Sequence, residues 1–291
     1  MSSASERAVV FECESEELVG IVHVLDPVVV DTGVLIIVGG PQYRAGSHRQ
    51  FILLARFLAA QCIPVMRFDY RGMGDSSGEL RGFEDISADI NTAIDTFCRE
   101  VPSLKKVVLW GLCDAASAAL FYAPTDPRVT GLVLLNPWVH TEAGQAKTIL
   151  KHYYSSRFFS KAFWGKLTSG KFNLAKSLHS LAQLSKAAQA KDEKNTCGIT
   201  PLPQRMLAGL GGFEGRILII LSGNDLTADE FRELVKHSSE WQQVMQTKGV
   251  HVRQFAEADH TFSRGEWREQ VERSTLAFIE SLLHGYDEGL C

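Results

Sequence analysis

Cys113 lies where a short apolar run meets a run of helix-forming residues. The sequence there reads Gly111-Leu112-Cys113-Asp114-Ala115, with a small residue two positions before and two positions after the cysteine. This is the spacing of a nucleophile elbow, G-x-S-x-G, with cysteine in place of serine and alanine in place of the second glycine. Small neighbours are required because the nucleophile occupies a strained backbone conformation where a strand and a helix close up. We therefore predict that Cys113 is a nucleophile.

A cysteine nucleophile needs a base for its proton and a carboxylate that orients the base. Proteins with this elbow carry them in the chain order nucleophile, acid, histidine. Asp225 follows the apolar run 216–221, and His260 follows the run 250–255. We predict Asp225 as the acid and His260 as the base. Asp259 is a rival acid, but as the immediate neighbour of His260 it points elsewhere in most backbone geometries.

The negative charge that develops on an acyl oxygen needs two backbone N–H donors. We expect one from Asp114 and the other from the loop after the apolar run 34–38. Pro41 has no N–H to donate, so the second donor is Gly40 or Gln42, and we favour Gln42. An acidic side chain beside a thiolate is unfavourable unless it points away. We therefore expect the Asp114 carboxylate to face the adjacent helix or the entrance of the site.

Apolar runs alternate with helical patterns along most of the chain. Residues 8–25 predict a pair of strands, and the runs at 33–38, 63–68, 107–112, 131–135, 216–221 and 250–255 predict six more. Helices are predicted after Cys113 and at 48–60 (with Ser47 as N-cap), 83–100, 227–246 and 265–284. This alternation implies right-handed crossovers and a mostly parallel sheet. The predicted site residues follow strands, and the carboxyl ends of parallel strands meet at one edge.

The alternation breaks between residues 139 and 212, where helical patterns at 145–168 and 174–190 replace the buried strands. Ten lysines and arginines lie between Lys147 and Lys194, against two acidic residues, and aromatic residues are interleaved with them. One interpretation is a lid whose apolar face packs on the core while its lysines face water. The alternatives are a basic entrance for an anionic acyl carrier, such as a coenzyme A or carrier-protein thioester, or peripheral attachment to an anionic membrane.

Composition excludes several classes of function. The net charge of −4 argues against nucleic acid as the main partner. No apolar run approaches the roughly 20 residues of a membrane span, and the first residues have no apolar signal region. The six cysteines show no zinc spacing, and we expect reduced thiols in a cytoplasm and no metal or other cofactor.

Four stretches resemble known families. Residues 69–76, Asp69-Tyr70-Arg71-Gly72-Met73-Gly74-Asp75-Ser76, are similar to the D-x-R-G-x-G-x-S loop of the α/β-hydrolase superfamily, in which we expect Asp69 and Arg71 to pair. Together with residues 39–51, 111–116 and 222–227, this loop resembles the exosortase A system-associated hydrolase 1 family. Such proteins are encoded beside exopolysaccharide and exosortase genes in Gram-negative bacteria. The resemblance implies a role near polysaccharide export or protein sorting.

We predict an α/β-hydrolase fold with a mostly parallel eight-stranded sheet, helices on both faces and a helical cap. The core would comprise residues 1–138 and 213–291, and the cap residues 139–212. The predicted function is hydrolysis of an ester or thioester, from a small-molecule or carrier-bound acyl substrate, through a covalent acyl-cysteine. Dienelactone hydrolase and the polyester synthases are α/β-hydrolase relatives that use cysteine in this way. The alternatives are an acyltransferase with the same intermediate, and a non-catalytic accessory protein of an exopolysaccharide or exosortase system that contacts a partner through its cap.

Overall fold

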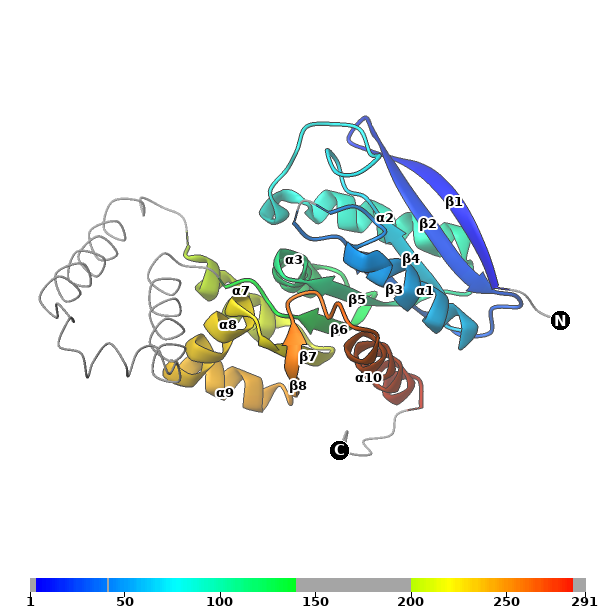
Figure 1. The fold of residues 1–291 in the computed structure, drawn as a ribbon. Coiled ribbons are helices and arrows are strands. Elements are labelled where there is room, and N and C mark those ends of the chain that lie inside the picture. Colours follow the sequence, from blue (N-terminus) through cyan, green and yellow to red (C-terminus); the bar gives the residue numbers. More distant parts are fainter. Residues whose placement is uncertain (1–3, 41, 140–199, 285–291) are drawn as a thin grey trace, which may run out of the picture.

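The computed structural model describes residues 4–40, 42–139 and 200–284. Its strands are β1 (Ala4–Cys13), β2 (Glu16–Leu25), β3 (Thr32–Ile37), β4 (Val65–Phe68), β5 (Lys106–Leu112), β6 (Val129–Leu135), β7 (Arg216–Asn224) and β8 (His251–Asp259). In the described part of the chain they form one eight-stranded sheet in the order β1-β2-β4-β3-β5-β6-β7-β8 (Figure 1). β2 is antiparallel to both β1 and β4, and the other neighbouring pairs are parallel. The predicted eight-stranded, mostly parallel sheet is confirmed.

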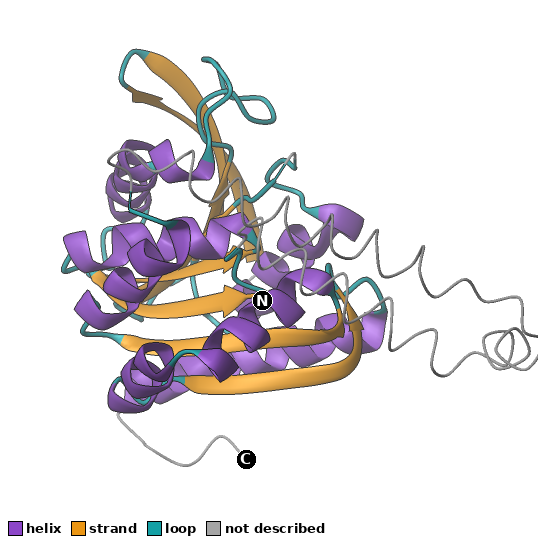
Figure 2. Ribbon diagram, turned by 90° about the vertical axis from the view of Figure 1, so that its left-hand side faces the viewer, coloured by secondary structure: helices purple, strands orange, loops and turns teal. Residues whose placement is uncertain are grey.

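Helices cover both faces of this sheet (Figure 2). They are α1 (Gln50–Ala60), α2 (Ser87–Glu100), α3 (Asp114–Tyr122), α7 (Leu202–Gly212), α8 (Leu226–His237), α9 (Ser239–Thr247) and α10 (Gly265–His284). Alternate residues of β3 point to opposite faces. Val34 and Ile36 pack with α1 and α10, whereas Leu35 and Ile37 belong to the core under the other helices. All six residues of β3 are buried, because a parallel strand covered on both faces has no exposed side.

The start of α1 differs from the prediction. Ser47 is not its N-cap, because a short 3₁₀ turn, Ser47–Arg49, precedes the helix. His48 and Arg49 have positive φ angles of 53° and 60°, so regular helix begins only at Gln50. The backbone N–H of Ser47 instead donates to Oε1 of Gln42, at 3.1 Å. This contact ties the first turn to the loop that follows β3.

The helix predicted at 227–246 is two helices. The break is at Ser238, which has an extended backbone with φ −119° and ψ 114°. Its hydroxyl accepts the N–H of Trp241 at 3.4 Å and so caps α9. Serine favours this position because its oxygen satisfies a backbone donor that has no partner within the helix.

The carboxyl-terminal part of the predicted cap forms α7, which packs against α3. A Cβ added at Gly209 would lie 2.3 Å from the carbonyl oxygen of Leu120, so the two helices are in close contact. The helical stretches predicted at 145–168 and 174–190, and the basic residues between Lys147 and Lys194, lie outside the described residues. None of the helices that the structure describes is long and apolar enough to cross a membrane.

Candidate active site

Cys113 occupies the sharp turn between β5 and α3. Its backbone has φ 63° and ψ −122°, a conformation that residues with a Cβ rarely adopt. A Cβ added at Gly111 would lie 2.6 Å from the carbonyl carbon of Ala115, so only glycine leaves room for the helix to return over the strand. The turn is therefore strained in the way that a nucleophile elbow requires, and the cysteine side chain is half-buried.

Asp225 follows β7 and caps the amino end of α8. Its carboxylate accepts the backbone N–H groups of Thr227 at 3.2 Å and Ala228 at 3.1 Å. The same carboxylate lies 2.9 Å from Nδ1 of His260, which follows β8. Because β7 and β8 are parallel neighbours, residues after their carboxyl ends are brought together at one edge of the sheet.

The side chain of Cys113 also interacts with the His260 ring, and this interaction raises the pKa of His260. Burial lowers the pKa of His260, but the hydrogen bonds and charges of Asp225 and Cys113 outweigh this effect and raise it to about 10. The imidazole ring is therefore bonded to the carboxylate through Nδ1 and interacts with the cysteine side chain. This is the connectivity of a nucleophile, base and acid triad.

Asp259, the rival acid, faces away from this pair. Its carboxylate accepts both the backbone N–H and the hydroxyl of Ser263. Burial raises the pKa of Asp259, but these hydrogen bonds outweigh it, and the net pKa is lowered. Of the two candidate acids, Asp225 is the one that bonds to the ring of His260.

The side chain of Asp114 bonds to the first turn of the adjacent helix α3, as one of the two predicted directions allows, and also to the loop after β3. Oδ2 of Asp114 accepts the backbone N–H of Gly40 at 2.9 Å, and Oδ1 accepts the N–H of Ala115 at 3.0 Å. A Cβ on Gly39 would lie 2.3 Å from Oδ1, so glycine there makes room for the carboxylate. Burial raises the pKa of Asp114, and the bonds from Gly40 and Ala115 oppose that rise. The aspartate thus joins the nucleophile elbow to the loop.

Both candidates for the second donor to the acyl oxygen, the N–H groups of Gly40 and Gln42, already form hydrogen bonds in this structure. The N–H of Gly40 donates to the Asp114 carboxylate, and the N–H of Gln42 donates to the carbonyl of Gly40 at 2.8 Å. Pro41, between them, lies outside the described residues. An acyl oxygen would have to displace one of these two hydrogen bonds.

The expected pairing of Asp69 with Arg71 is wrong. Asp69, which is fully buried, bonds to the backbone and guanidinium of Arg44 on the loop after β3. Arg71 donates to both carboxylate oxygens of Asp89, at 2.9 and 2.8 Å, and also pairs with Glu14. The two side chains bond in different directions, so one fastens the 69–78 loop to the loop after β3 and the other fastens it to α2.

Sequence reasoning gave no role to Arg44 or Asn136. Arg44 holds the loop after β3 through Asp69, and Asn136 bonds to the segments that carry Asp225 and His260. The only local signal for Asn136 is its place in an Asn-Pro pair after an apolar strand, which marks a turn. Among the described residues, no three histidine, cysteine or acidic side chains are grouped so as to hold a metal ion.

The sheet topology, the elbow and the residues gathered at the strand ends define the class of α/β hydrolases. The family described as serine aminopeptidase, S33, matches residues 32–211, and the chain belongs to it. No curated protein matches the chain. Since the family description names a serine enzyme, the cysteine in this elbow is a departure from it.

Solved structures share the fold at low sequence identity. An esterase of Pyrococcus furiosus, Pf2001, superposes with a TM-score of 0.64 at 15% identity, over 96% of this chain and 91% of its own. An acylaminoacyl peptidase of Pyrococcus horikoshii gives a TM-score of 0.64 at 15% identity, over 100% of this chain and 43% of its own. XC6422 of Xanthomonas campestris, described as an α/β serine hydrolase without a lid, gives 0.56 at 13% identity, over 94% and 95%.

Proposed function

We propose that this α/β hydrolase cleaves an ester or thioester through a covalent acyl-cysteine. The observation that carries the proposal is the 2.9 Å contact between Nδ1 of His260 and the Asp225 carboxylate, on a ring that also interacts with Cys113 at the strained elbow. Cysteine suits this role because its thiolate is a good nucleophile and also a good leaving group.

In the first step, Sγ of Cys113 attacks the acyl carbon and forms a carbon–sulfur bond. The protonated ring of His260 then gives its proton to the leaving alcohol or thiol as the bond to that group breaks. In the second step, His260 takes a proton from water, and the hydroxide attacks the acyl carbon. The carbon–sulfur bond breaks, which releases the carboxylic acid and restores the thiolate and imidazolium pair. Asp225 keeps Nδ1 protonated and the ring aligned throughout.

The Asp114 amide and the Gln42 amide are the proposed donors to the acyl oxygen. Gln42 donates to the carbonyl of Gly40 two residues earlier, a tight turn that a small shift of the loop opens. The Gly40 amide is held by a carboxylate, and charged acceptors form the stronger hydrogen bonds. This difference favours Gln42 over Gly40 as the second donor.

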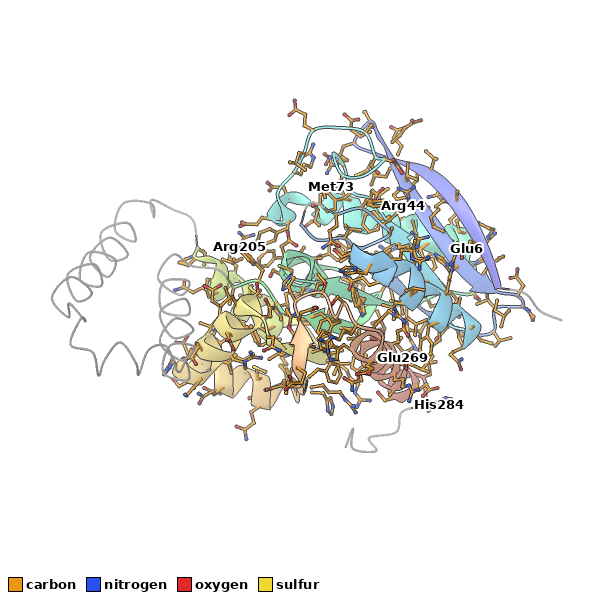
Figure 3. The ribbon with its side chains drawn as sticks, in the orientation of Figure 1. Glu6, Arg44, Met73, Arg205, Glu269 and His284 are labelled. Carbon is orange, nitrogen blue, oxygen red and sulfur yellow. The ribbon has the colours of Figure 1, made fainter. Side chains whose placement is uncertain are left out.

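An open surface depression lies between the loop after β3 and the 69–78 loop, lined by Gln42, Tyr43, Met73, Gly74 and Asp75. Met73 lies on the 69–78 loop and Arg44 on the loop after β3, and both are labelled in Figure 3. Gln42, the proposed second donor, lines this depression, which makes it the proposed place for part of a small-molecule or carrier-bound acyl substrate. The lining contains both an aromatic ring and a carboxylate, which favours a substrate with apolar and polar parts.

There are two alternative functions. One uses the same catalytic site, and the other involves no catalysis. An acyltransferase would pass the acyl group from Cys113 to an alcohol or amine in place of water. A non-catalytic accessory protein would use the basic segment between Lys147 and Lys194 to contact a protein or membrane partner.

The four cysteines among the described residues are free, which supports the cytoplasm as the proposed location.

The test is the intact mass of the protein after brief exposure to a panel of aryl esters and acyl-coenzyme A thioesters, with free acid measured in the same samples. Wild type, Cys113→Ala and His260→Ala are compared. Cys62→Ala is the matched control, because Cys62 is an exposed free cysteine far from the elbow in sequence. We expect an acyl adduct and free acid with wild type and Cys62→Ala, and neither with Cys113→Ala.

Other outcomes separate the alternatives. An adduct that persists in water and is discharged only by an added alcohol or amine would establish acyl transfer. Absence of adduct and of free acid across the whole panel would contradict catalysis and favour the accessory role.

A further inference from the structure

The turn that follows β6, Asn136–Trp138, contacts the nucleophile elbow through its backbone. The N–H of Cys113 donates to the carbonyl of Leu135 at 2.8 Å, and the N–H of Trp138 donates to the carbonyl of Cys113 at 3.2 Å. The hydroxyl of Ser117, one turn into α3, donates to the carbonyl of Trp138 at 2.7 Å. The strained elbow is therefore hydrogen-bonded to the end of β6, the strand beside β5, and to the turn that follows β6.

The side chain of Asn136 contacts the other two site segments. Its Oδ1 accepts the N–H of Ser222 at 2.9 Å, and its Nδ2 donates to the Ser222 hydroxyl at 2.9 Å. Nδ2 also donates to the backbone carbonyl of His260 at 3.1 Å. Ser222 lies on β7, three residues before Asp225, which follows the end of that strand. One residue thus bonds to the strand that precedes the acid and to the loop that carries the base.

Burial makes these contacts strong constraints. Asn136 and Ser222 are both fully buried, where water cannot replace a hydrogen bond that is lost. Asn136 has φ 43°, a left-handed conformation that asparagine and glycine tolerate better than other residues. By contrast, about a third of the His260 side chain is exposed. The histidine loop lies at the edge of the protein, and its backbone is fastened to a buried point.

We propose that Asn136 is a positioning residue that holds the His260 loop at bonding distance from Cys113. It acts through the carbonyl of His260 and has no contact with the reacting atoms. A displacement of about 1 Å between reacting groups can reduce a rate by about 100-fold. The inference rests on the proposed function, in which His260 exchanges a proton with the Cys113 thiol.

Two substitutions suit the positive φ angle and remove different contacts. Asn136→Gly removes all three side-chain hydrogen bonds. Asn136→Asp keeps the acceptor for the Ser222 N–H but loses both donor contacts, including the one to His260. Ser222→Ala is the matched control, because it removes one buried hydrogen bond of Asn136 and leaves the bond to His260 intact.

The measurement is the alkylation rate of Cys113 by iodoacetamide as a function of pH, followed on the Cys113 peptide by mass spectrometry. The ring titration of His260 is measured in parallel by NMR. We expect wild type and Ser222→Ala to agree, with His260 titrating far above its ordinary pKa. In Asn136→Gly the pKa of His260 should fall toward 6.5, and alkylation near neutral pH should slow by about 10-fold or more. In Asn136→Asp alkylation should also slow, but the added negative charge should limit the fall in the pKa of His260.

The result that overturns the inference is a folded Asn136→Gly or Asn136→Asp protein, with cooperative urea unfolding, that keeps the wild-type alkylation profile and His260 titration. A drop equal to that of Ser222→Ala would also overturn it, because the effect would then be general loss of a buried bond. Failure of the proposed triad would give a result different from failure of this inference. In that case His260→Ala leaves the alkylation profile of wild type unchanged.

Discussion

Oδ2 of Asp225 accepts two hydrogen bonds, from Nδ1 of His260 at 2.9 Å and from the backbone N–H of Ala228 at 3.1 Å. The carboxylate therefore orients the base and caps helix α8 with the same oxygen. The positive end of the helix dipole stabilises its negative charge. This double use links the alignment of the candidate base to a rigid element of the fold.

Asp225→Asn should separate the two roles. Asparagine caps a helix about as well as aspartate, so we expect the helix cap to survive and the loss in the free energy of unfolding to be confined to pH values below about 10, where Asp225 stabilises protonated His260. The neutral amide neither stabilises the imidazolium nor fixes the tautomer with Nδ1 protonated, and kcat/KM should fall by about 10³-fold or more. Steady-state kinetics with an ester identified by the mass panel, together with urea unfolding, measure both effects. Asp259→Asn should leave kcat/KM near wild type, and a comparable loss there would contradict the assignment of the acid.

The raised pKa of His260 should make the stability of the protein depend on pH. Burial lowers this pKa, but the bonds to Asp225 and Cys113 raise it from 6.5 to about 10. The native state thus holds the proton more tightly than the unfolded chain does. The resulting stabilisation is fully present below pH 6.5 and is lost as the pH rises through about 10.

The measurement for this prediction is urea unfolding of wild type and His260→Gln across that pH range. We expect the free energy of unfolding of wild type to fall more steeply between pH 6.5 and about 10 than that of the variant. Glutamine cannot titrate, so its curve reports the other groups. Parallel curves for the two proteins would show that the histidine is not held by these partners.

Gly111→Ala should destabilise the elbow. The added Cβ would lie 2.6–2.8 Å from backbone atoms of Ala115 and Ala116, which belong to the first turn of α3 and cannot move aside. We expect a loss of about 1–3 kcal/mol in the free energy of unfolding and loss of Cys113 acylation. Gly82→Ala is the control, because a Cβ there meets no atom within 4 Å and the φ angle is −72°. Equal stability of the two variants would contradict the close approach of strand and helix.

Asp89→Ala should destabilise the protein strongly. The Arg71 side chain is 2% exposed, and Asp89 accepts its backbone N–H and two of its guanidinium nitrogens. Removing the carboxylate leaves a buried cation with Glu14 as its partner, at a cost of about 3–5 kcal/mol. Glu214→Ala, which breaks the exposed pair with Lys248, should cost less than about 1 kcal/mol. Urea unfolding measures both, and a small effect of Asp89→Ala would show that the pair does not anchor the 69–78 loop.

Much of the fold follows directly from local sequence. A parallel strand buried on both faces needs an unbroken apolar run, so β3, β5, β6 and β7 could be located from composition alone. The elbow could be located as well, because the spacing around Cys113 reflects a steric requirement between residues adjacent in sequence. Asp225 and His260 could be located because the acid and the histidine follow the nucleophile in the chain, each after a predicted strand. The boundaries that failed, at Ser47 and Ser238, depend on single φ and ψ angles.

Side-chain direction is what the tertiary structure decided. The sequence placed two carboxylates near His260, and the structure turned Asp225 toward the ring and Asp259 toward Ser263. Asp69 pairs with Arg44 and not with Arg71, although Arg71 is only two residues away. Such bonds join residues far apart in the chain, and no local pattern encodes them.

The sequence by itself determined the class of fold and the edge of the sheet where Cys113, Asp225 and His260 gather. The tertiary structure decided that the Asp114 carboxylate reaches the Gly40 amide and that Asn136 fastens the His260 loop. The physical reason is the separation along the chain of the residues that interact. Strands, helices and the elbow are set by sterics and burial within a few residues. A hydrogen bond between residues 74 or 124 positions apart exists only after the sheet has brought the segments together.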